Sequence, residues 1–343
     1  MGVTLFSLVA FIGIAQQICV DERATLERLD KTPGRLLTFD ATIPGNPLVR
    51  ASFVLADIKA SDFPDLGGLR NLKHVGFHAS KVSGDILARL SKSQSLESLH
   101  LQGVEVNDGQ LASLQSLKLL KSLVLTDACV SDEGVKYFAH LKGLEVVGLS
   151  GTQISAVGVS RLSRLSKLQD LNLSRTKISD DACRTLSRFS HLRKLDLSST
   201  AISDKGFLDL EPVLAQLECL SIVQTRLSGD SWPRITLLKR VKKLSVGGRF
   251  VDNKFLESAG TLASLQELDI NEARTCDAGI GHLMKATKLT SLSIWNADLT
   301  DEGLMLLVHH KGITLISLIG TRVTKSGVER FRSVRPGVFI EHY

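Results

Sequence analysis

Apolar residues recur along most of the chain in one pattern, Leu-x-x-Leu-x-Leu, in which x is usually polar. Successive copies are 24 residues apart, apart from one interval of 25 before Leu217. A weaker copy begins at Leu48, and a shortened copy with Val338 and Ile340 ends the chain. The other copies begin at Leu72, Leu96, Leu120, Leu144, Leu168, Leu192, Val241, Leu265, Leu289 and Ile313. This fixed interval predicts a stack of equivalent structural units.

Each unit contains signals for one strand and one helix. The alternation of apolar and polar residues predicts a short strand. Ten residues into the unit another apolar position recurs, and only Thr275 interrupts that column. Pairs such as Ser131-Asp132 and Thr300-Asp301 follow, and their oxygens can accept hydrogen bonds from the free N–H groups of a helix start. Stacking such units would join their leucines into one continuous core.

The stretch Leu168-Gln-Asp-Leu171-Asn-Leu173 shows the pattern most clearly, and from Leu48 onward the chain resembles the leucine-rich repeat family. Thr or Ala replaces the family's usual Asn after the strand, as at Thr176 and Ala297. The resemblance is to the helix-bearing, ribonuclease-inhibitor-like class and to bacterial envelope members with one N-terminal hydrophobic segment. It implies an α/β solenoid, a horseshoe with a parallel concave sheet and convex helices, which binds protein partners. It does not imply an enzyme activity.

The N-terminal segment differs from the repeats. Residues 1–20 contain no charged side chain and are interpreted as a hydrophobic leader, which is an uncleaved anchor, a cleaved signal or a buried helix. Helical spacing over residues 21–31 ends at Thr32-Pro33-Gly34, and residues 36–39 predict a short strand. We therefore expect a leader over 1–20, an N-terminal cap over 21–47 and a repeat array over 48–343. The protein is expected to be membrane-anchored or secreted.

The longer interval before Leu217 coincides with Pro212. Gly229, Trp232 and Pro233 follow shortly afterwards. Proline removes a helical hydrogen bond, so the helices of these units are expected to be irregular. Trp232 is expected to fill the resulting gap.

Composition narrows the chemistry. A net charge of +6 over 343 residues does not indicate nucleic acid, and 5% aromatic residues argue against a stacking platform for single strands. The five cysteines include no CxxC pair, so neither a disulfide framework nor a zinc module follows. No glycine-rich phosphate loop, HExxH motif or nucleophile elbow occurs, and no cofactor is expected.

Strand alternation places the third, fifth and seventh residues of each copy on the concave surface. Trp295 and Ile319 are one period apart there, and Leu315 lies on the same strand as Ile319. We interpret these three residues as anchors for a protein partner, unless a C-terminal segment covers them. The predicted partner-binding set also includes polar residues that would tune specificity: His74, His78, His100, Asp170 and Asp196.

Two chemical alternatives exist for these polar residues. The Cα atoms of His74 and His78 would lie about 13 Å apart, so three imidazoles including His100 could share a metal only at the limit of their reach. Asp170 and Asp196 could act as paired carboxylates. However, a lysine follows Asp170 at the equivalent position of the next unit, so cross-strand ion pairing explains the carboxylates without catalysis.

Basic residues recur near the predicted helix ends. They complement the helix dipole, or alternatively form a ridge that binds phosphate or a membrane. This column comprises Lys92, His140, Arg164, Arg188 and Lys285.

The sequence thus predicts a non-enzymatic scaffold that recognises an unknown protein partner, with a membrane contact possible through the N-terminal segment. The main alternative is an intracellular adaptor, such as the substrate-reading part of a ubiquitin ligase. That role needs a recruitment domain, and only 27 residues separate the expected leader from Leu48. A polysaccharide-binding or hydrolytic enzyme would need a cleft rich in aromatic residues and carboxylates, which the sequence does not indicate.

Overall fold

The computed structural model describes residues 20–342 except 44, 60, 62, 84, 275 and 276. The chain divides into two compact units, Met1–Ile154 and Ser155–Tyr343, which we call the N-terminal and C-terminal units. The leader expected over 1–20 lies outside the described residues apart from the backbone of Val20, and so does Thr275. Among the described helices, none combines the length and the apolar character needed to cross a bilayer.

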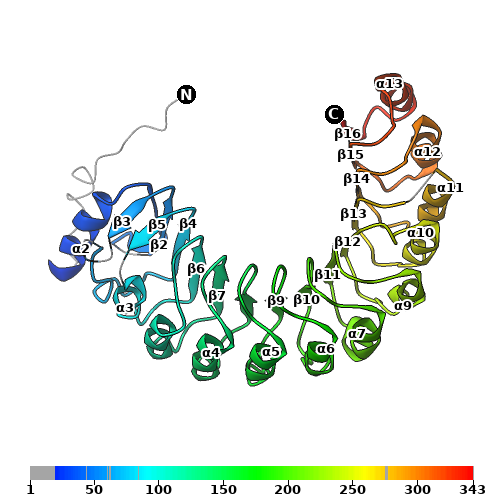
Figure 1. Cartoon of the computed structure of the whole chain (residues 1–343). Coiled ribbons are helices and arrows are strands. Elements are labelled where there is room, and N and C mark those ends of the chain that lie inside the picture. The colour runs from blue at the N-terminus through cyan, green and yellow to red at the C-terminus, as the bar shows by residue number, and fades with distance from the viewer. Residues whose placement is uncertain are drawn as a thin grey trace. The chain divides into compact units, whose positions relative to one another are not determined.

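The N-terminal unit contains a mostly parallel sheet with helices on one side (Figure 1). Its sheet order is β1-β2-β4-β6-β7-β8, and β3 and β5 form a separate pair. The strands are β1 (Arg35–Phe39), β2 (Leu48–Val54), β3 (Asp57–Lys59), β4 (His74–His78), β5 (Lys81–Ser83), β6 (Ser98–Gln102), β7 (Ser122–Thr126) and β8 (Val146–Gly148). The helices are α2 (Val20–Asp30), α3 (Ile86–Leu90) and α4 (Asp132–Val135), with 3₁₀ turns η2 (Gln110–Ser116) and η3 (Lys136–His140).

The start of the described chain closes this sheet at one end. The predicted helix and strand are confirmed as α2 and β1. Strand β1 runs antiparallel to β2, whereas every other pair in the unit is parallel. Beneath this end, Phe53 stacks on Phe77 at 4.9 Å and meets Phe63 edge-on at 5.3 Å. Phenylalanine thus fills the space that leucine fills in later repeats.

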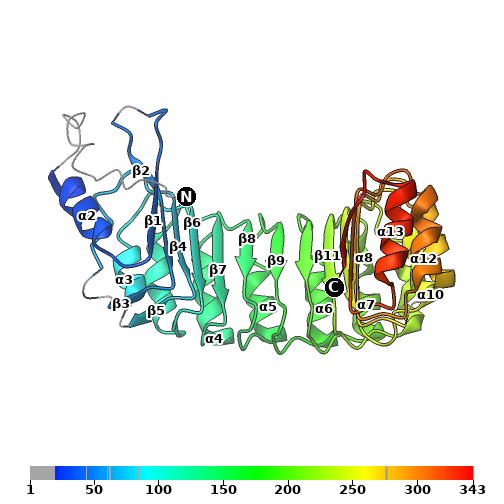
Figure 2. The same cartoon turned by 90° about the horizontal axis from the view of Figure 1, so that it is seen from above.

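The C-terminal unit contains a wholly parallel sheet in which consecutive strands are neighbours (Figure 1). Figure 2 gives the view from above. Its strands are β9 (Asp170–Asn172), β10 (Lys194–Asp196), β11 (Cys219–Ile222), β12 (Lys243–Gly247), β13 (Glu267–Asn271), β14 (Ser291–Trp295), β15 (Leu315–Ile319) and β16 (Phe339–His342). The helices are α5 (Ala156–Leu162), α6 (Asp180–Leu186), α7 (Asp204–Asp209), α8 (Glu211–Leu214), α9 (Trp232–Ile235), α10 (Asn253–Gly260), α11 (Asp277–Ile280), α12 (Asp301–Leu306) and α13 (Lys325–Val334). The 3₁₀ turns are η4 (Gly229–Ser231), η5 (Gly281–Lys285) and η6 (Leu307–His309).

In both units the leucine columns are the core. The apolar strand positions pair in register, as Leu99 does with Leu123 in the N-terminal unit and Leu268 with Leu292 in the C-terminal unit. These four side chains are fully buried. The predicted sharing of one core by successive repeats is therefore confirmed within each unit.

Carboxylates at the helix starts join each repeat to the next. Asp277 accepts hydrogen bonds from the Thr300 backbone N–H at 2.9 Å and from its hydroxyl at 2.6 Å. A glycine makes room for this carboxylate, since a Cβ on Gly303 would overlap it. Ala156 occupies the position of the aspartate in one repeat, and Ala182 then occupies the position of the glycine. The same bonds link Asp108 to Ser131, Asp180 to Ser203, Asp204 to Ser228 and Asp301 to Thr324.

The expected irregularity is present in the C-terminal unit. Two short helices, α7 and α8, occupy the repeat with the longer interval, and Pro212 lies in the first turn of α8. Trp232 is buried, packs edge-on against Phe255 at 5.2 Å and donates its indole N–H to the Phe250 carbonyl at 2.9 Å. The tryptophan therefore fills the core behind the shortened helix α9, as predicted.

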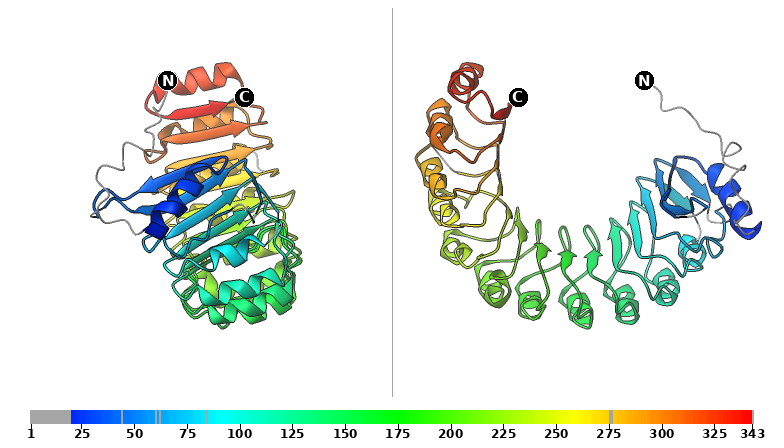
Figure 3. Two further views of the ribbon diagram at one scale, coloured as in Figure 1. Left: turned by 90° about the vertical axis from the view of Figure 1, so that its left-hand side faces the viewer. Right: turned by 180° about the vertical axis from the view of Figure 1, so that it is seen from behind.

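Arg335 closes the last turns of the C-terminal unit, beside the helix α13 that Figure 3 shows in red. Its guanidinium donates to the carbonyls of Val308 at 2.8 Å, His310 at 2.9 Å and Ile313 at 3.2 Å. These bonds satisfy three backbone acceptors at the last described turns of the unit.

Candidate partner-binding surfaces

Helices cover one face of each sheet, and we call the opposite face of each unit its open face (Figure 1). Alternate strand residues point to it, because side chains alternate along a strand. The burial pattern of β14, in which Leu292 and Ile294 are buried between more exposed neighbours, shows this alternation. The residues predicted to bind a partner all occupy open-face positions.

Exposed apolar side chains gather at the end of the C-terminal unit. Trp295 pairs in register with Ile319, and Leu315 pairs with Phe339. The exposed fractions are 43% for Trp295, 38% for Leu315 and 65% for Phe339, so no described segment covers the group. We call Trp295, Leu315, Ile319 and Phe339 the C-terminal apolar patch.

A short hydrogen-bonded chain fixes the indole of Trp295. Its N–H donates to the Ser317 hydroxyl at 3.3 Å, and that hydroxyl donates to the Glu341 carboxylate at 2.9 Å. Ser317 is only 5% exposed, since these neighbours cover it. The indole is therefore held across strand β15 before any partner arrives, which lowers the ordering entropy that binding must overcome.

Phe339 was absent from the predicted binding set, although it is the most exposed member of the patch. The sequence did contain its signal, because Phe339 lies one 24-residue period after Leu315. The shortened final repeat lacks a leucine at the start of the motif, and this obscured the equivalence. Strand β16 shows that the repeat register continues to the end of the described chain.

Charged residues also lie on this open face, and several of them form ion pairs. The Lys194 ammonium lies 3.5 Å from the Asp170 carboxylate. Lys243 lies 2.9 Å from Glu267 and 3.6 Å from Asp269. Cross-strand pairing is thus confirmed. Burial raises the pKa of Asp170, and the neighbouring Lys194 opposes that shift.

Asp196 is engaged within its own turn. Its Oδ1 atom accepts a hydrogen bond from the Ser198 backbone N–H at 2.9 Å. Burial raises the pKa of the nearby Cys219 thiol. A thiol that stays protonated is a poor nucleophile.

The predicted histidines gather on the open face of the N-terminal unit. His74 and His78 flank Gly76 on β4, and His100 pairs with Gly76 from β6. The His100 Nε2 atom lies 3.0 Å from the Ser122 hydroxyl and 3.3 Å from the Ser98 hydroxyl. No group of three or more His, Cys, Asp or Glu in the described parts of the chain is placed to hold a metal ion.

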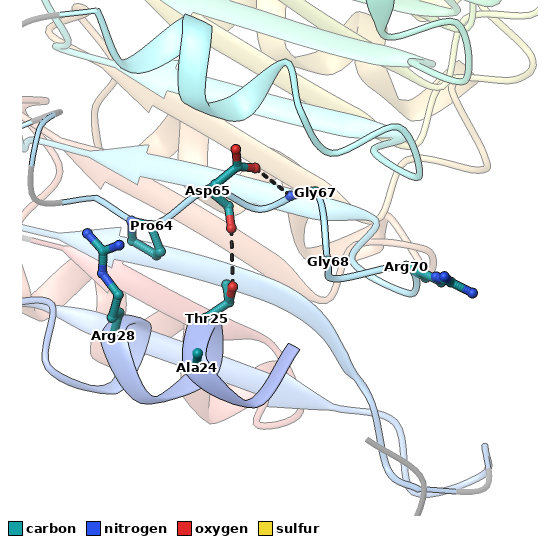
Figure 4. Close-up of a pocket in the computed structure, with 8 residues that line it drawn as sticks. All are labelled: Ala24, Thr25, Arg28, Pro64, Asp65, Gly67, Gly68 and Arg70. Carbon is teal, nitrogen blue, oxygen red and sulfur yellow. Dashed lines mark hydrogen bonds between the residues drawn. The ribbon is translucent and has the colours of Figure 1, made fainter. Parts of the chain in front are cut away.

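A cavity of about 540 Å³ lies beside α2 in the N-terminal unit (Figure 4). The Thr25 hydroxyl donates to the Asp65 carbonyl at 3.3 Å, and the Asp65 carboxylate accepts the Gly67 N–H at 2.9 Å. Arg28 and Arg70 also line it. The carboxylate is engaged within its own turn, which indicates a structural role.

The basic column has its expected position in the helical layer. His140 and Lys285 lie in the last turns of the 3₁₀ segments η3 and η5. Positive charge there complements the helix dipole. The alternative of a phosphate- or membrane-binding ridge stays a prediction.

Comparisons with known proteins agree with this architecture. A family model described as leucine rich repeat matches residues 142–202, and a second leucine-rich repeat model matches residues 116–139 and 285–308. No curated protein matches the sequence of this chain.

Solved structures extend the likeness to nearly the whole chain. An internalin from Listeria monocytogenes superposes with a TM-score of 0.59 over 96% of each chain, at 16% sequence identity. A leucine-rich-repeat protein from Leptospira interrogans gives a TM-score of 0.47 at 15% identity, covering 93% of this chain and 97% of that one. At such identities the likeness shows the fold, an α/β leucine-rich-repeat solenoid. Proteins of this kind generally act in protein–protein interaction and are typically non-enzymatic.

Proposed function

We propose that the chain, a leucine-rich-repeat protein, binds a protein partner through the C-terminal apolar patch and does so without catalysis. The observation that carries this proposal is the exposure of Trp295, Leu315 and Phe339 together on one solvated sheet face. Large apolar side chains that are exposed together and surrounded by polar groups are typical of protein interfaces.

The geometry of the patch suggests how a partner is held. Trp295 and Ile319 lie at the carboxyl ends of their strands, whereas Leu315 and Phe339 lie at the amino ends. The two pairs are about 13 Å apart, with Ser317 between them. A partner segment that crosses the strands can place one apolar side chain on each pair and a hydrogen-bonding group at the centre.

The surrounding charge favours a partner with basic residues beside its apolar ones. The carboxylates of Glu267, Asp269 and Glu341 lie on the same open face, and Lys243 pairs with the first two. Like charges opposed across an interface are unfavourable, so an acidic partner would be rejected here. Asp170 and Asp196 extend the acidic character along the same sheet and would tune specificity.

We also propose that the protein acts at or beyond a membrane. The support is the uncharged, largely apolar sequence of residues 1–20. Cell fractionation with protease protection tests this location, and the full chain is expected in the membrane fraction or the medium. Recovery of the full chain from the cytosol alone would favour the intracellular-adaptor alternative.

Site-specific photo-cross-linking tests the binding face. A photoreactive residue at Phe339 is expected to capture one defined partner, whereas the same residue at Val334, on α13 and 55% exposed, is expected to capture none. The captured protein is then purified and titrated against the variants. Capture from Val334 but not from Phe339 would assign binding to the helical side.

Trp295→Ala is expected to weaken binding of the purified partner by about 30-fold, because the indole supplies a large, pre-positioned apolar surface. Leu306→Ala is the matched control, since Leu306 on α12 is 44% exposed. Isothermal titration calorimetry measures both affinities. Equal affinity of the Trp295→Ala variant and the parent protein would remove the patch from the interface.

A further inference from the structure

The described strand positions on the open face of the N-terminal unit carry positive and titratable groups. Arg50 pairs in register with His74, and His78 follows on the same strand. Together with His100 these residues form what we call the histidine face. No described open-face position of β1, β2, β4, β6, β7 or β8 is an aspartate or a glutamate.

The histidine face is concentrated around Gly76, where the sheet backbone has no side chain. A Cβ placed on Gly76 would lie 3.0 Å from the His78 Nε2 atom, so this ring leans over the glycine. His100 pairs with Gly76 from the next strand. Because the two rings and His74 surround one bare stretch of backbone, their N–H groups can converge on a ligand laid across it.

The carboxylate nearest to His100 in the sequence, that of Glu97, already forms ion pairs with two lysines. Glu97 precedes β6 and lies 2.6 Å from the Lys121 ammonium and 3.3 Å from the Lys73 ammonium. It raises the pKa of His74 only against larger opposing effects from burial and from Arg50. The histidine face therefore has no internal carboxylate that neutralises it when its imidazoles are protonated.

Burial and neighbouring positive charge lower the pKa of His74 and of His100 in the free protein. Burial lowers the pKa of His100 most, and the charges of His78, Arg50 and His74 lower it further. A bound anion would reverse the effect of the like charges, so binding and protonation would favour each other.

We propose that the histidine face binds an acidic segment of a protein and that this binding strengthens as the pH falls. Carboxylate side chains would accept hydrogen bonds from Arg50 and from the protonated rings of His78 and His100. An extended peptide fits better than a compact anion, because His74 and His78 are about 13 Å apart along the strand. This binding and the proposed function depend on one common premise, that the open face of a unit binds a protein.

The test uses the full chain and a fluorescent oligoglutamate peptide of about eight residues, with an oligoglutamine peptide of equal length as the uncharged control. Fluorescence anisotropy at constant ionic strength is measured at about pH 5.5 and about pH 7.5, a range over which histidine titrates and glutamate stays ionised. Oligoglutamate is expected to bind about tenfold more tightly at the lower pH, and oligoglutamine is expected not to bind.

Variants assign the effect to the histidine face. His78→Gln combined with His100→Gln is expected to abolish the pH dependence, whereas His191→Gln, an exposed histidine of the C-terminal unit, is expected to preserve it. Arg50→Gln is expected to weaken binding at both pH values. Circular dichroism at both pH values verifies folding, and the two single histidine variants, each halving the pH effect, replace the double variant if it unfolds.

Binding that does not change with pH, or that keeps its pH dependence in the histidine variants, would overturn the proposal. Inorganic phosphate or a sulfated oligosaccharide that binds these residues while oligoglutamate does not would overturn the assignment to an acidic peptide. Trp295→Ala is expected to leave oligoglutamate binding unchanged, so the failure of either proposal can be recognised separately.

Discussion

The open faces of the two units display opposite chemistry on the same kind of sheet. The described open-face strand positions of the N-terminal unit present Arg50 and three histidines and no carboxylate, whereas the open face of the C-terminal unit presents carboxylates, two paired lysines and the apolar patch. Beneath both faces the buried strand positions are occupied by leucine and similar residues in the same register. Alternation along each strand thus separates the residues that build the sheet from those that meet other molecules.

The largest expected effects test whether the buried leucines contribute equally to the stability of the two units. Leu99→Ala in the N-terminal unit and Leu268→Ala in the C-terminal unit should each lower the free energy of unfolding by about 2–5 kcal/mol, because each removes a fully buried side chain. Urea denaturation followed by circular dichroism measures both.

The adjacent open-face residues are the controls for these two variants. Ser98→Ala and Glu267→Gln should change the free energy of unfolding by less than about 1 kcal/mol, since both side chains are partly exposed. If an open-face variant lowered the free energy of unfolding as much as the neighbouring leucine variant, the open-face and buried positions would not differ in their contribution to stability.

Intermediate effects are expected at the glycines that accommodate the helix-start carboxylates. Gly134→Ala and Gly303→Ala should each cost about 1–3 kcal/mol, because the new Cβ would overlap Asp108 or Asp277 respectively. Thermal unfolding monitored by circular dichroism gives the comparison between the units.

A second substitution should relieve the overlap. Asp277→Ala in the Gly303→Ala background should recover part of the lost stability, as the natural combination of Ala156 and Ala182 suggests. Strictly additive losses in the double variant would show that the carboxylate is not what excludes the methyl group.

The smallest expected effect is on the pH dependence of stability. It should differ between histidines on the open face of the N-terminal unit and histidines of the C-terminal unit. Because the folded state lowers the pKa of His100 below its ordinary value of 6.5, the unfolded chain binds more protons under mildly acidic conditions. Stability should therefore fall as the pH drops through that value.

His100→Gln should reduce the pH dependence of stability. The slope of the unfolding free energy between about pH 7.5 and 5.5 is expected to be shallower in this variant than in the parent protein. His191→Gln is the control from the C-terminal unit and should leave the slope unchanged. An unchanged slope in His100→Gln together with a shallower slope in His191→Gln would show that His100 is not the group responsible for the pH dependence.

The sequence predicted the scaffold well because the leucine columns, the helix caps and the 24-residue interval are local and repeated. It also predicted that Trp295 and Ile319 are neighbours, since equivalent positions of consecutive repeats pair in a parallel sheet. Even the lysine–carboxylate pairs followed from the same rule.

Side-chain directions could not be predicted in this way. The repeat register does not specify that the Trp295 indole lies against Ser317, or that His78 leans over Gly76. Phe339 was missed because its repeat lacks the first leucine. These features depend on rotamers and on neighbours from other strands, and no periodic pattern encodes them.

Acrylamide quenching of tryptophan fluorescence tests the central claim most directly, because one of the two tryptophans is buried and the other lies in the patch. The measurement is made on the full chain with and without a saturating amount of the partner captured from Phe339. Binding should shield Trp295, so the quenching constant should fall toward that of the Trp295→Phe variant, in which only the buried Trp232 emits. An unchanged quenching constant with the partner fully bound would contradict the account.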